Sequence, residues 1–153
     1  MNWYKIAQEN SQPSPNGFLW HGTTQKINGP LEPRQAHDIG GSPTSNMNAI
    51  YATPNRDFAI MMGLTERGSD VFTNHSQSPL QLVLVNGKIR HGQQMYLYKL
   101  PKDTFTDTGD VQEWVSQESV MPISEEVLNV DDYLHLIRQP NKSDMQFWNS
   151  NQQ

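Results

Sequence analysis

The sequence predicts a compact α+β domain in which short strands outnumber helices. Most of its apolar segments are short and lie between stretches rich in proline, glycine and polar residues, which is typical of strands. Only residues 53–63 and 129–139 repeat apolar side chains at helical spacing. With 153 residues and 35% hydrophobic content, the chain can bury a core. We therefore expect a single domain over 1–153, with polar terminal segments at 1–16 and 140–153.

The first half of the chain is predicted to contain two buried strands and one helix. Residues 17–23, "GFLWHGT", are a short apolar run that ends in a turn signal. Prolines and glycines then recur through 25–48, which we expect to be irregular. The second strand, "AIYAT" at 49–53, leads directly into a helix. Thr53 is the expected N-cap of that helix, and a proline follows at its first position.

The middle of the chain predicts a loop followed by a hairpin. Residues 66–79 are polar and are expected to form a loop. An apolar strand over 80–85 ends at an Asn-Gly turn signal, and a second strand with alternating side chains covers 95–100. The His-Gly pair at 91–92 offers a competing turn, but a hairpin between the two strands remains the expectation.

The last third predicts one strand, one short helix and a polar tail. The strand covers 113–123, and the helix is the amphipathic segment 129–139. The tail over 140–153 is polar apart from Phe147 and Trp148, which we expect to dock back onto the domain.

Composition and charge exclude several classes of function. Cysteine is absent, so the chain has no disulfide framework, thiol nucleophile or zinc–thiolate site. The net charge of −5 argues against a protein that coats nucleic acid or an anionic membrane, and leaves nucleic acid possible only as a substrate. No apolar run approaches the length of a membrane span, and the polar start does not resemble a signal peptide. We expect a cytoplasmic monomer.

Three short motifs carry the candidate chemistry. They are "WHGTT" around His21, "IYATPNRDFA" around Tyr51 and "VQEWVS" around Glu113. Each of the three residues lies at a predicted strand edge, beside small or hydroxyl residues or a polar loop. Taken singly, such residues usually serve packing or solvation, so the hypothesis rests on all three occurring in this order.

The three motifs together resemble the His–Tyr–Glu signature of the ADP-ribosyltransferase fold, in the branch typified by diphtheria toxin and the poly(ADP-ribose) polymerases. In that branch a His-Gly-Thr or His-Gly-Ser ends the first core strand. A tyrosine followed by a small and a hydroxyl residue precedes a helix, and a glutamate followed by an aromatic residue begins a late strand. The "YAT" at 51–53 and the "EWV" at 113–115 fit this pattern. The resemblance spans about residues 18–123 and implies a split antiparallel β-sheet core with few short helices.

The resemblance implies a small, toxin-like mono-ADP-ribosyltransferase. It would cleave the nicotinamide–ribose bond of NAD without a metal and transfer ADP-ribose to an unidentified acceptor. Because nicotinamide leaves as a neutral molecule, no general acid is needed, and one carboxylate can stabilise the oxocarbenium-like sugar. Glu113 is the expected carboxylate, and Tyr51 is expected to stack on the nicotinamide. The loop over 102–112 leads to Glu113 and is expected to meet the acceptor. A protein, a nucleic acid and a small molecule stay open as acceptors.

The first motif is expected to bind the rest of the dinucleotide. His21 would hydrogen-bond the adenosine ribose, since a neutral imidazole offers one donor and one acceptor. Gly22 lacks a side chain, so its N–H and C=O could approach the nicotinamide carboxamide closely. Thr23 would reach a nearby ribose.

Further cofactor-binding residues are expected around this core. Thr53 belongs to the second motif, and Arg34 or Lys26 would contact the phosphates. The diphtheria-toxin branch has a second tyrosine that forms the other wall of the nicotinamide slot. Here that position falls near Met61 and Met62, whose thioethers can also pack against a ring.

Several alternatives stay open. Glu118 rivals Glu113 for the catalytic role, although on an alternating strand the two would face opposite sides. Val111 stands where arginine-modifying members usually have Glu or Gln, which makes arginine a less favoured acceptor. A non-catalytic NAD- or ADP-ribose-binding or interaction module with the same fold is one further possibility. An enzyme like the RNA 2′-phosphotransferases is another, but that class expects a cluster of arginines.

Overall fold

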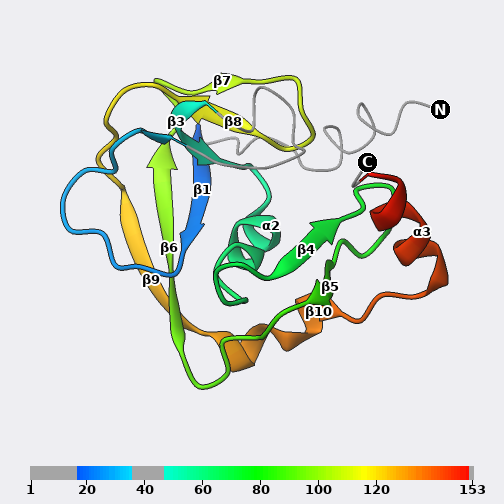
Figure 1. Ribbon diagram of the computed structural model, residues 1–153. Helices are drawn as coiled ribbons and strands as arrows, with labels where there is room; N and C mark the ends of the chain where they lie inside the picture. The colour runs from blue at the N-terminus through cyan, green and yellow to red at the C-terminus, as the bar shows by residue number, and fades with distance from the viewer. Residues whose placement is uncertain (1–16, 36–46, 152–153) are drawn as a thin grey trace.

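The computed structural model describes residues 17–35 and 47–151, which form three small sheets and a few short helices (Figure 1). The strand orders are β1-β6-β9, β2-β3-β8-β7 and β10-β5-β4. All neighbouring strands are antiparallel except the pair β5 and β10. The predicted α+β class, mostly antiparallel with few short helices, is thus confirmed. Expectations for 1–16 and 36–46 lie outside the described residues.

The first sheet contains the strand that ends in the histidine motif. It is formed by β1 (Phe18–Thr23), β6 (Gln94–Pro101) and β9 (Ser124–Asn129), with β6 in the middle. β6 buries side chains on both of its faces, whereas in β1 only Leu19 is buried and the other residues are half-buried. The strand predicted over 17–23 is present to within one residue, but only Leu19 in it is fully buried.

The second sheet carries the other two motifs. Its central strands are β3 (Asn48–Ala52) and β8 (Trp114–Ser116), and its edges are β2 (Arg34–Gln35) and β7 (Thr106–Asp107). The strand predicted over 113–123 is much shorter in the structure. After β8 the chain bends, because its next backbone pairing is with the loop after β1 and not with a strand.

Helix α2 (Arg56–Met61) follows β3 and packs against β1. The predicted N-cap is wrong, because Asn55, and not Thr53, caps the helix by accepting a hydrogen bond from Phe58 N at 3.2 Å. Thr53 instead accepts one from Asn55 N at 3.1 Å, which stabilises the turn before the helix. Two successive side-chain turns thus join β3 to α2.

The predicted hairpin is also wrong, because its two strands belong to different sheets. β5 (Leu82–Asn86) pairs with β4 (Asp70–Thr73) and with β10 (Ile137–Arg138), whereas β6 lies in the first sheet. The intervening chain is held against the end of α2, where Arg90 N donates to Leu64 O at 2.9 Å. β4 itself falls in the segment predicted as a loop.

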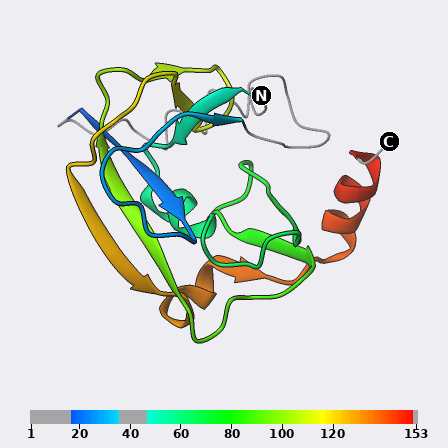
Figure 2. The ribbon, with the colours of Figure 1, turned by 60° about the vertical axis from the view of Figure 1, so that its left-hand side comes forward.

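The C-terminal segment is more ordered than its polarity suggests. The predicted helix over 129–139 divides into a 3-10 helix, η2 (Val130–Leu136), and the short strand β10. The segment predicted as a polar tail forms helix α3 (Lys142–Ser150). Figure 2 shows α3 at the end of the molecule that lies opposite β9. The Trp148 ring stacks on Phe72 of β4, and the Phe147 ring packs against Phe72 at a tilt, so both residues dock onto the domain as predicted.

Two apolar clusters pack on opposite faces of β1 and β6. One cluster contains α2 together with Met95 and Leu97, and the other contains Leu19, Ile50 and Leu100. β1 is therefore covered by a helix on one face and by strands and loops on the other. In the part of the chain that the structure describes, no helix has the length and apolar character to cross a membrane.

Candidate functional site

The site lies at a split between the first two sheets. Trp20 of β1 and Thr53, which follows β3, exchange two backbone hydrogen bonds, at 2.8 and 2.9 Å. Within residues 17–35 and 47–151, β1 and β3 form no further backbone pair. Every second residue of a strand directs its N–H and C=O to the same side. Gly22 therefore presents its N–H and C=O to the split, on the side where Trp20 binds Thr53.

Gly22 also allows α2 to lie against β1. A Cβ at this position would lie 1.8 Å from the carbonyl oxygen of Ala59 in α2. No side chain fits, so close packing requires a glycine here. The helix in turn closes one face of β1 at the point where the two sheets separate.

The His21 side chain bridges the split. Its Nδ1 lies 2.6 Å from the carbonyl oxygen of Tyr51. A carbonyl can only accept, so Nδ1 carries the proton and donates. Burial is the main cause that lowers the pKa of His21, and the charge of Arg34 acts in the same direction. A neutral ring whose Nδ1–H is committed to Tyr51 has only Nε2 left, as an acceptor.

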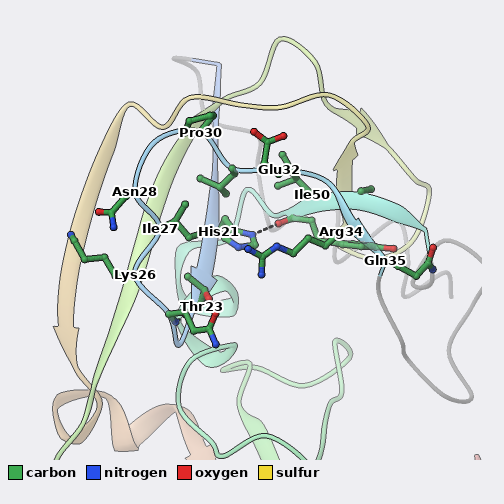
Figure 3. A pocket seen from close by; sticks show the side chains of 14 residues that line it. His21, Thr23, Lys26, Ile27, Asn28, Pro30, Glu32, Arg34, Gln35 and Ile50 are labelled. Atoms are coloured by element: carbon green, nitrogen blue, oxygen red, sulfur yellow. Dashed lines mark hydrogen bonds between the residues drawn. The ribbon is translucent and has the colours of Figure 1, made fainter.

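A cavity of about 530 Å³ opens beside His21 (Figure 3). Its volume lies in the range of small-molecule sites. It is bounded by β1, by β2 and β3 of the second sheet, and by the loop that joins β1 to β2. The lining includes five predicted site residues, which are His21, Thr23, Lys26, Arg34 and Tyr51.

The two predicted phosphate ligands, Lys26 and Arg34, differ in whether their side chains are free to bind a ligand. Lys26 Nζ lies 2.7 Å from Glu125 Oε1, and Tyr98 Oη donates to Glu125 Oε2 at 2.9 Å. Figure 3 shows the Lys26 side chain directed away from His21, whereas that of Arg34 extends beside the ring. Arg34 forms no ion pair with any residue that the structure describes. Arg34 is therefore the better placed of the two predicted phosphate ligands.

The loop itself is held to the first sheet by Tyr98. Ile27 N donates to Tyr98 Oη at 2.6 Å, and the Tyr98 ring is buried in the core. Further along, Leu31 and Val120 exchange backbone hydrogen bonds at 2.8 and 3.0 Å. The cavity wall is thus attached at two points, which favours a cavity that exists before any ligand binds.

Tyr51 is fixed at both ends. Its carbonyl receives the His21 bond, and its hydroxyl accepts a hydrogen bond from Met47 N at 2.7 Å. Its neighbours Ile50 and Ala52 belong to the cluster with Leu19, so by strand alternation the Tyr51 side chain points to the other face of β3.

Glu113 directly precedes β8, the strand that pairs with β3. In the pairing of β3 with β8, Ala52 is opposite Trp114, so the register places Glu113 beside Thr53. By alternation, Glu113 shares the face of Tyr51 and not that of the His21 ring. Its carboxylate oxygen Oε1 is buried, and its carbonyl accepts hydrogen bonds from the Thr108 amide and hydroxyl, both at 3.1 Å. Glu113 does not line the cavity beside His21.

Glu118 is placed differently from Glu113. It is exposed and follows the end of β8, where its amide donates to Ser116 Oγ at 3.2 Å. The expectation that alternation along one strand would separate the two glutamates does not apply, because the strand ends at Ser116. Burial separates them instead, and it favours Glu113 for a role in a water-poor site.

The other predicted residues are scattered around the split. Thr53 is buried, with 5% of its surface exposed, and its hydroxyl belongs to the turn before α2. Met61 is buried in the core and therefore cannot form a wall of an open slot. Met62, at the end of α2, is 50% exposed and available to a ligand. None of these three lines the cavity beside His21.

Sequence reasoning missed Gln112 and His75, of which the first is the chain neighbour of Glu113 and the second contacts Gln112. Gln112 is buried and directly precedes Glu113, and His75, from the loop between β4 and β5, lies with Nδ1 3.2 Å from Gln112 Nε2. No pattern in the sequence signals this contact, because it joins two loops 37 positions apart. In residues 17–35 and 47–151, no three His, Asp or Glu side chains are grouped so that they could hold a metal ion.

Comparison of the chain with protein-family models, with curated proteins and with solved structures gives no match. An assignment of function therefore rests on the motifs and on the geometry described above.

Proposed function

We propose that the chain is a mono-ADP-ribosyltransferase that cleaves the nicotinamide–ribose bond of NAD. One observation carries the proposal: the three motifs, far apart in sequence, occupy neighbouring positions across β1, β3 and β8. Trp20 and Thr53 are paired, and Thr53 lies beside Glu113 in the next register position. Opposite residues on adjacent strands are about 5 Å apart, so the motifs fit within the length of one dinucleotide.

The split between β1 and β3 supplies the binding groups. A carboxamide has an N–H donor and a carbonyl acceptor, which complement the C=O and N–H that Gly22 presents there. His21 Nε2 would accept a hydrogen bond from a ribose hydroxyl in the adjoining cavity. Arg34 would contact the pyrophosphate with a charge-assisted hydrogen bond. Thr23, Thr53 and Met62 remain proposed contacts along the same path.

The chemical step falls to Glu113. In a site that excludes water, its carboxylate would stabilise the positive charge that develops on the ribose and accept a hydrogen bond from the 2′-hydroxyl. Tyr51 lies on the same face of the sheet and would stack on the nicotinamide, which holds the bond in a reactive orientation. The aliphatic side chains of Val111 and Val115, two positions before and after Glu113 in the sequence, would limit the access of water.

The acceptor is proposed to approach from the segment before Glu113. This segment, over 102–112, includes β7 and the turn that ends at Gln112. A protein side chain, a nucleic acid or a small molecule could each occupy this side, and transfer of a single ADP-ribose fits a chain of this size.

The test is nicotinamide release from NAD, with binding measured separately by calorimetry. We expect Glu113→Gln to lower kcat by about a hundredfold or more while NAD still binds. The matched control, Glu118→Gln, should keep the wild-type rate. Equal loss in both variants, or loss only in Glu118→Gln, would contradict the role of Glu113. Binding without release by the wild type would favour the non-catalytic NAD-binding module.

A further inference from the structure

We infer that His75 is a positioning residue that orients Glu113 through the side chain of Gln112. The inference rests on the proposed function, in which Glu113 supplies the carboxylate. It extends that function to the loop between β4 and β5, which is separate from the three motifs in sequence and carries no signature of its own.

The His75 ring is held from three directions. Its Nε2 lies 3.0 Å from Thr73 Oγ1 at the end of β4, and its Nδ1 lies 3.2 Å from Gln112 Nε2. The Phe58 ring of α2 meets it edge to face, with centroids 5.0 Å apart and an interplanar angle of 86°. Contacts from β4, α2 and the segment before β8 therefore converge on one imidazole.

The hydrogen-bond pattern assigns a neutral ring. The amide nitrogen of Gln112 can only donate, so His75 Nδ1 accepts and Nε2–H donates to the Thr73 hydroxyl. Burial lowers the pKa of His75 to about 4, so the ring keeps this acceptor near neutral pH. In a protonated ring, Nδ1 would also carry a hydrogen. It would then face the N–H of the Gln112 amide, and two donors cannot form a hydrogen bond.

Gln112 has a backbone conformation that needs support. Its φ of 57° lies in the left-handed region, and no other non-glycine residue among those described has a positive φ. Such a conformation costs about 1 kcal/mol or more for a residue with a Cβ. The side chain is 7% exposed and is anchored at His75, so burial and this hydrogen bond offset the strain.

The torsion at Gln112 sets the direction of Glu113. The two residues share a peptide bond, so any relaxation at Gln112 turns the Glu113 Cα–Cβ bond as it enters β8. The strand itself is secured separately, because Val115 pairs with both Tyr51 and Thr106. Loss of the His75 contact should therefore move the carboxylate and leave β8 in place.

The experiment compares His75→Phe with His75→Asn. Phenylalanine keeps a ring beside Phe58 but has no nitrogen to hold Gln112, whereas the asparagine oxygen can replace Nδ1 as the acceptor. We expect His75→Phe to lower kcat for nicotinamide release about tenfold to a hundredfold with KM changed less than about threefold. His75→Asn should recover most of the rate. The control His135→Phe, on η2, should behave as the wild type.

A double-variant cycle tests the route through Gln112. Gln112→Gly removes the side chain that His75 holds, so adding His75→Phe to it should cause no further loss in kcat. Losses that multiply in the double variant would overturn the inference. A His75→Phe variant with wild-type kcat would also overturn it. The same holds if kcat falls only in proportion to a fall in melting temperature and His75→Asn does not restore it.

A readout without turnover separates this inference from the proposed function. The ¹³C signal of the Glu113 side-chain carboxyl can be followed through a pH titration in each variant. We expect its midpoint or its chemical shift to change in His75→Phe and not in His135→Phe. If the wild type releases no nicotinamide, the proposed function fails while this titration still decides the positioning role. An identical titration in all variants would overturn that role.

Discussion

In a continuous sheet, the carbonyl of Tyr51 would accept from a backbone amide of the next strand. Here the His21 Nδ1 takes that place at 2.6 Å, because β1 and β3 separate after the Trp20–Thr53 pair. The imidazole is longer than a backbone amide and so spans a wider gap. Because the imidazole replaces the backbone amide, the Tyr51 carbonyl keeps a hydrogen-bond donor, and the N–H and C=O of Gly22 stay directed into the split.

Two substitutions at His21 should separate its structural bond from its ligand bond. His21→Asn keeps an N–H that can donate to the Tyr51 carbonyl but removes the acceptor at Nε2. We expect it to weaken NAD binding about tenfold with little change in stability. His21→Ala should also lower the free energy of unfolding by about 1–3 kcal/mol, because the carbonyl loses its partner. Calorimetric titration and urea unfolding measure the two effects, and equal stability of both variants would contradict this division.

Gly22 should not tolerate even one added methyl group. The Cβ of Gly22→Ala would lie 1.8 Å from Ala59 O, which is backbone and cannot rotate away. We expect a loss of about 3 kcal/mol or more in the free energy of unfolding. Gly92→Ala is the control, since it meets no atom within 4 Å but has a φ of 73°. It should lose only about 1 kcal/mol from backbone strain, and a comparable loss in both variants would refute the packing argument.

The loop between β1 and β2 forms the outer wall of the cavity and is attached to the first sheet by Tyr98. Tyr98→Phe keeps the buried ring and removes the hydroxyl that binds Ile27 and Glu125. Because the Leu31–Val120 pair remains, we expect the loop to loosen without unfolding. NAD affinity should fall about fivefold, which corresponds to about 1 kcal/mol of lost hydrogen bonding. Faster amide exchange confined to this loop is the direct measurement, and unchanged exchange would contradict the attachment.

Helix α3 forms within a polar segment because its first turn is held by side chains. Asn141 and Asp144 make a capping box, and Arg138 binds the Asp144 carboxylate with both of its terminal nitrogens. The Arg138 guanidinium is the first cause that holds the pKa of Asp144 below its ordinary value. Asp144 is 3% exposed, so an unpaired charge there is costly.

Breaking this pair should detach α3. We expect Arg138→Met to lower the free energy of unfolding by about 3 kcal/mol, since it leaves a buried carboxylate without its partner. Adding Asp144→Leu to it should restore part of the loss, because no charge then remains buried. Urea unfolding gives both values. A double variant as unstable as the single one would indicate that the helix depends on the ion pair itself.

The whole molecule should lose stability on mild acidification because it buries two neutral histidines. Burial lowers the pKa of both His21 and His75, the latter from 6.5 to about 4. Their folded pKa values lie below the unfolded ones, so the unfolded chain binds more protons and stability falls as the pH drops from about 6.5 towards 4. After allowance for partial solvent exposure, His75 alone should contribute on the order of 2 kcal/mol.

Urea unfolding at pH 7.5, 6 and 5 measures this dependence. His75→Phe should flatten the slope, while the surface control His135→Phe should leave it unchanged. A wild-type stability that stays level over this range would show that the two rings are not held neutral by burial.

The two strands that bear His21 and Tyr51 could be predicted because each is a short apolar run with a clear end signal, and a strand of this kind depends on residues close in sequence. The contacts of these strands with distant segments could not be predicted. The apolar segments around 80–85 and 95–100 suggest a hairpin, but strand pairing is chosen by competition among all strands, and β5 and β6 each found partners elsewhere. His75 contacts Gln112, the residue before Glu113, and the contact joins two loops where no periodicity exists to signal it.

The chain by itself determined the α+β class and the strand that carries His21, since these follow from residue types and near-neighbour spacing. The choice of an imidazole, a phenol ring and a carboxylate as candidate reacting groups came from the resemblance of three short motifs to a known family. Only the tertiary structure decided that β1 and β3 separate after one pair, that Gly22 lies under α2, and that Glu113 enters β8 from a left-handed Gln112. These features depend on packing between segments distant in sequence, where the free energy of each contact is set by every element that competes for the same surface.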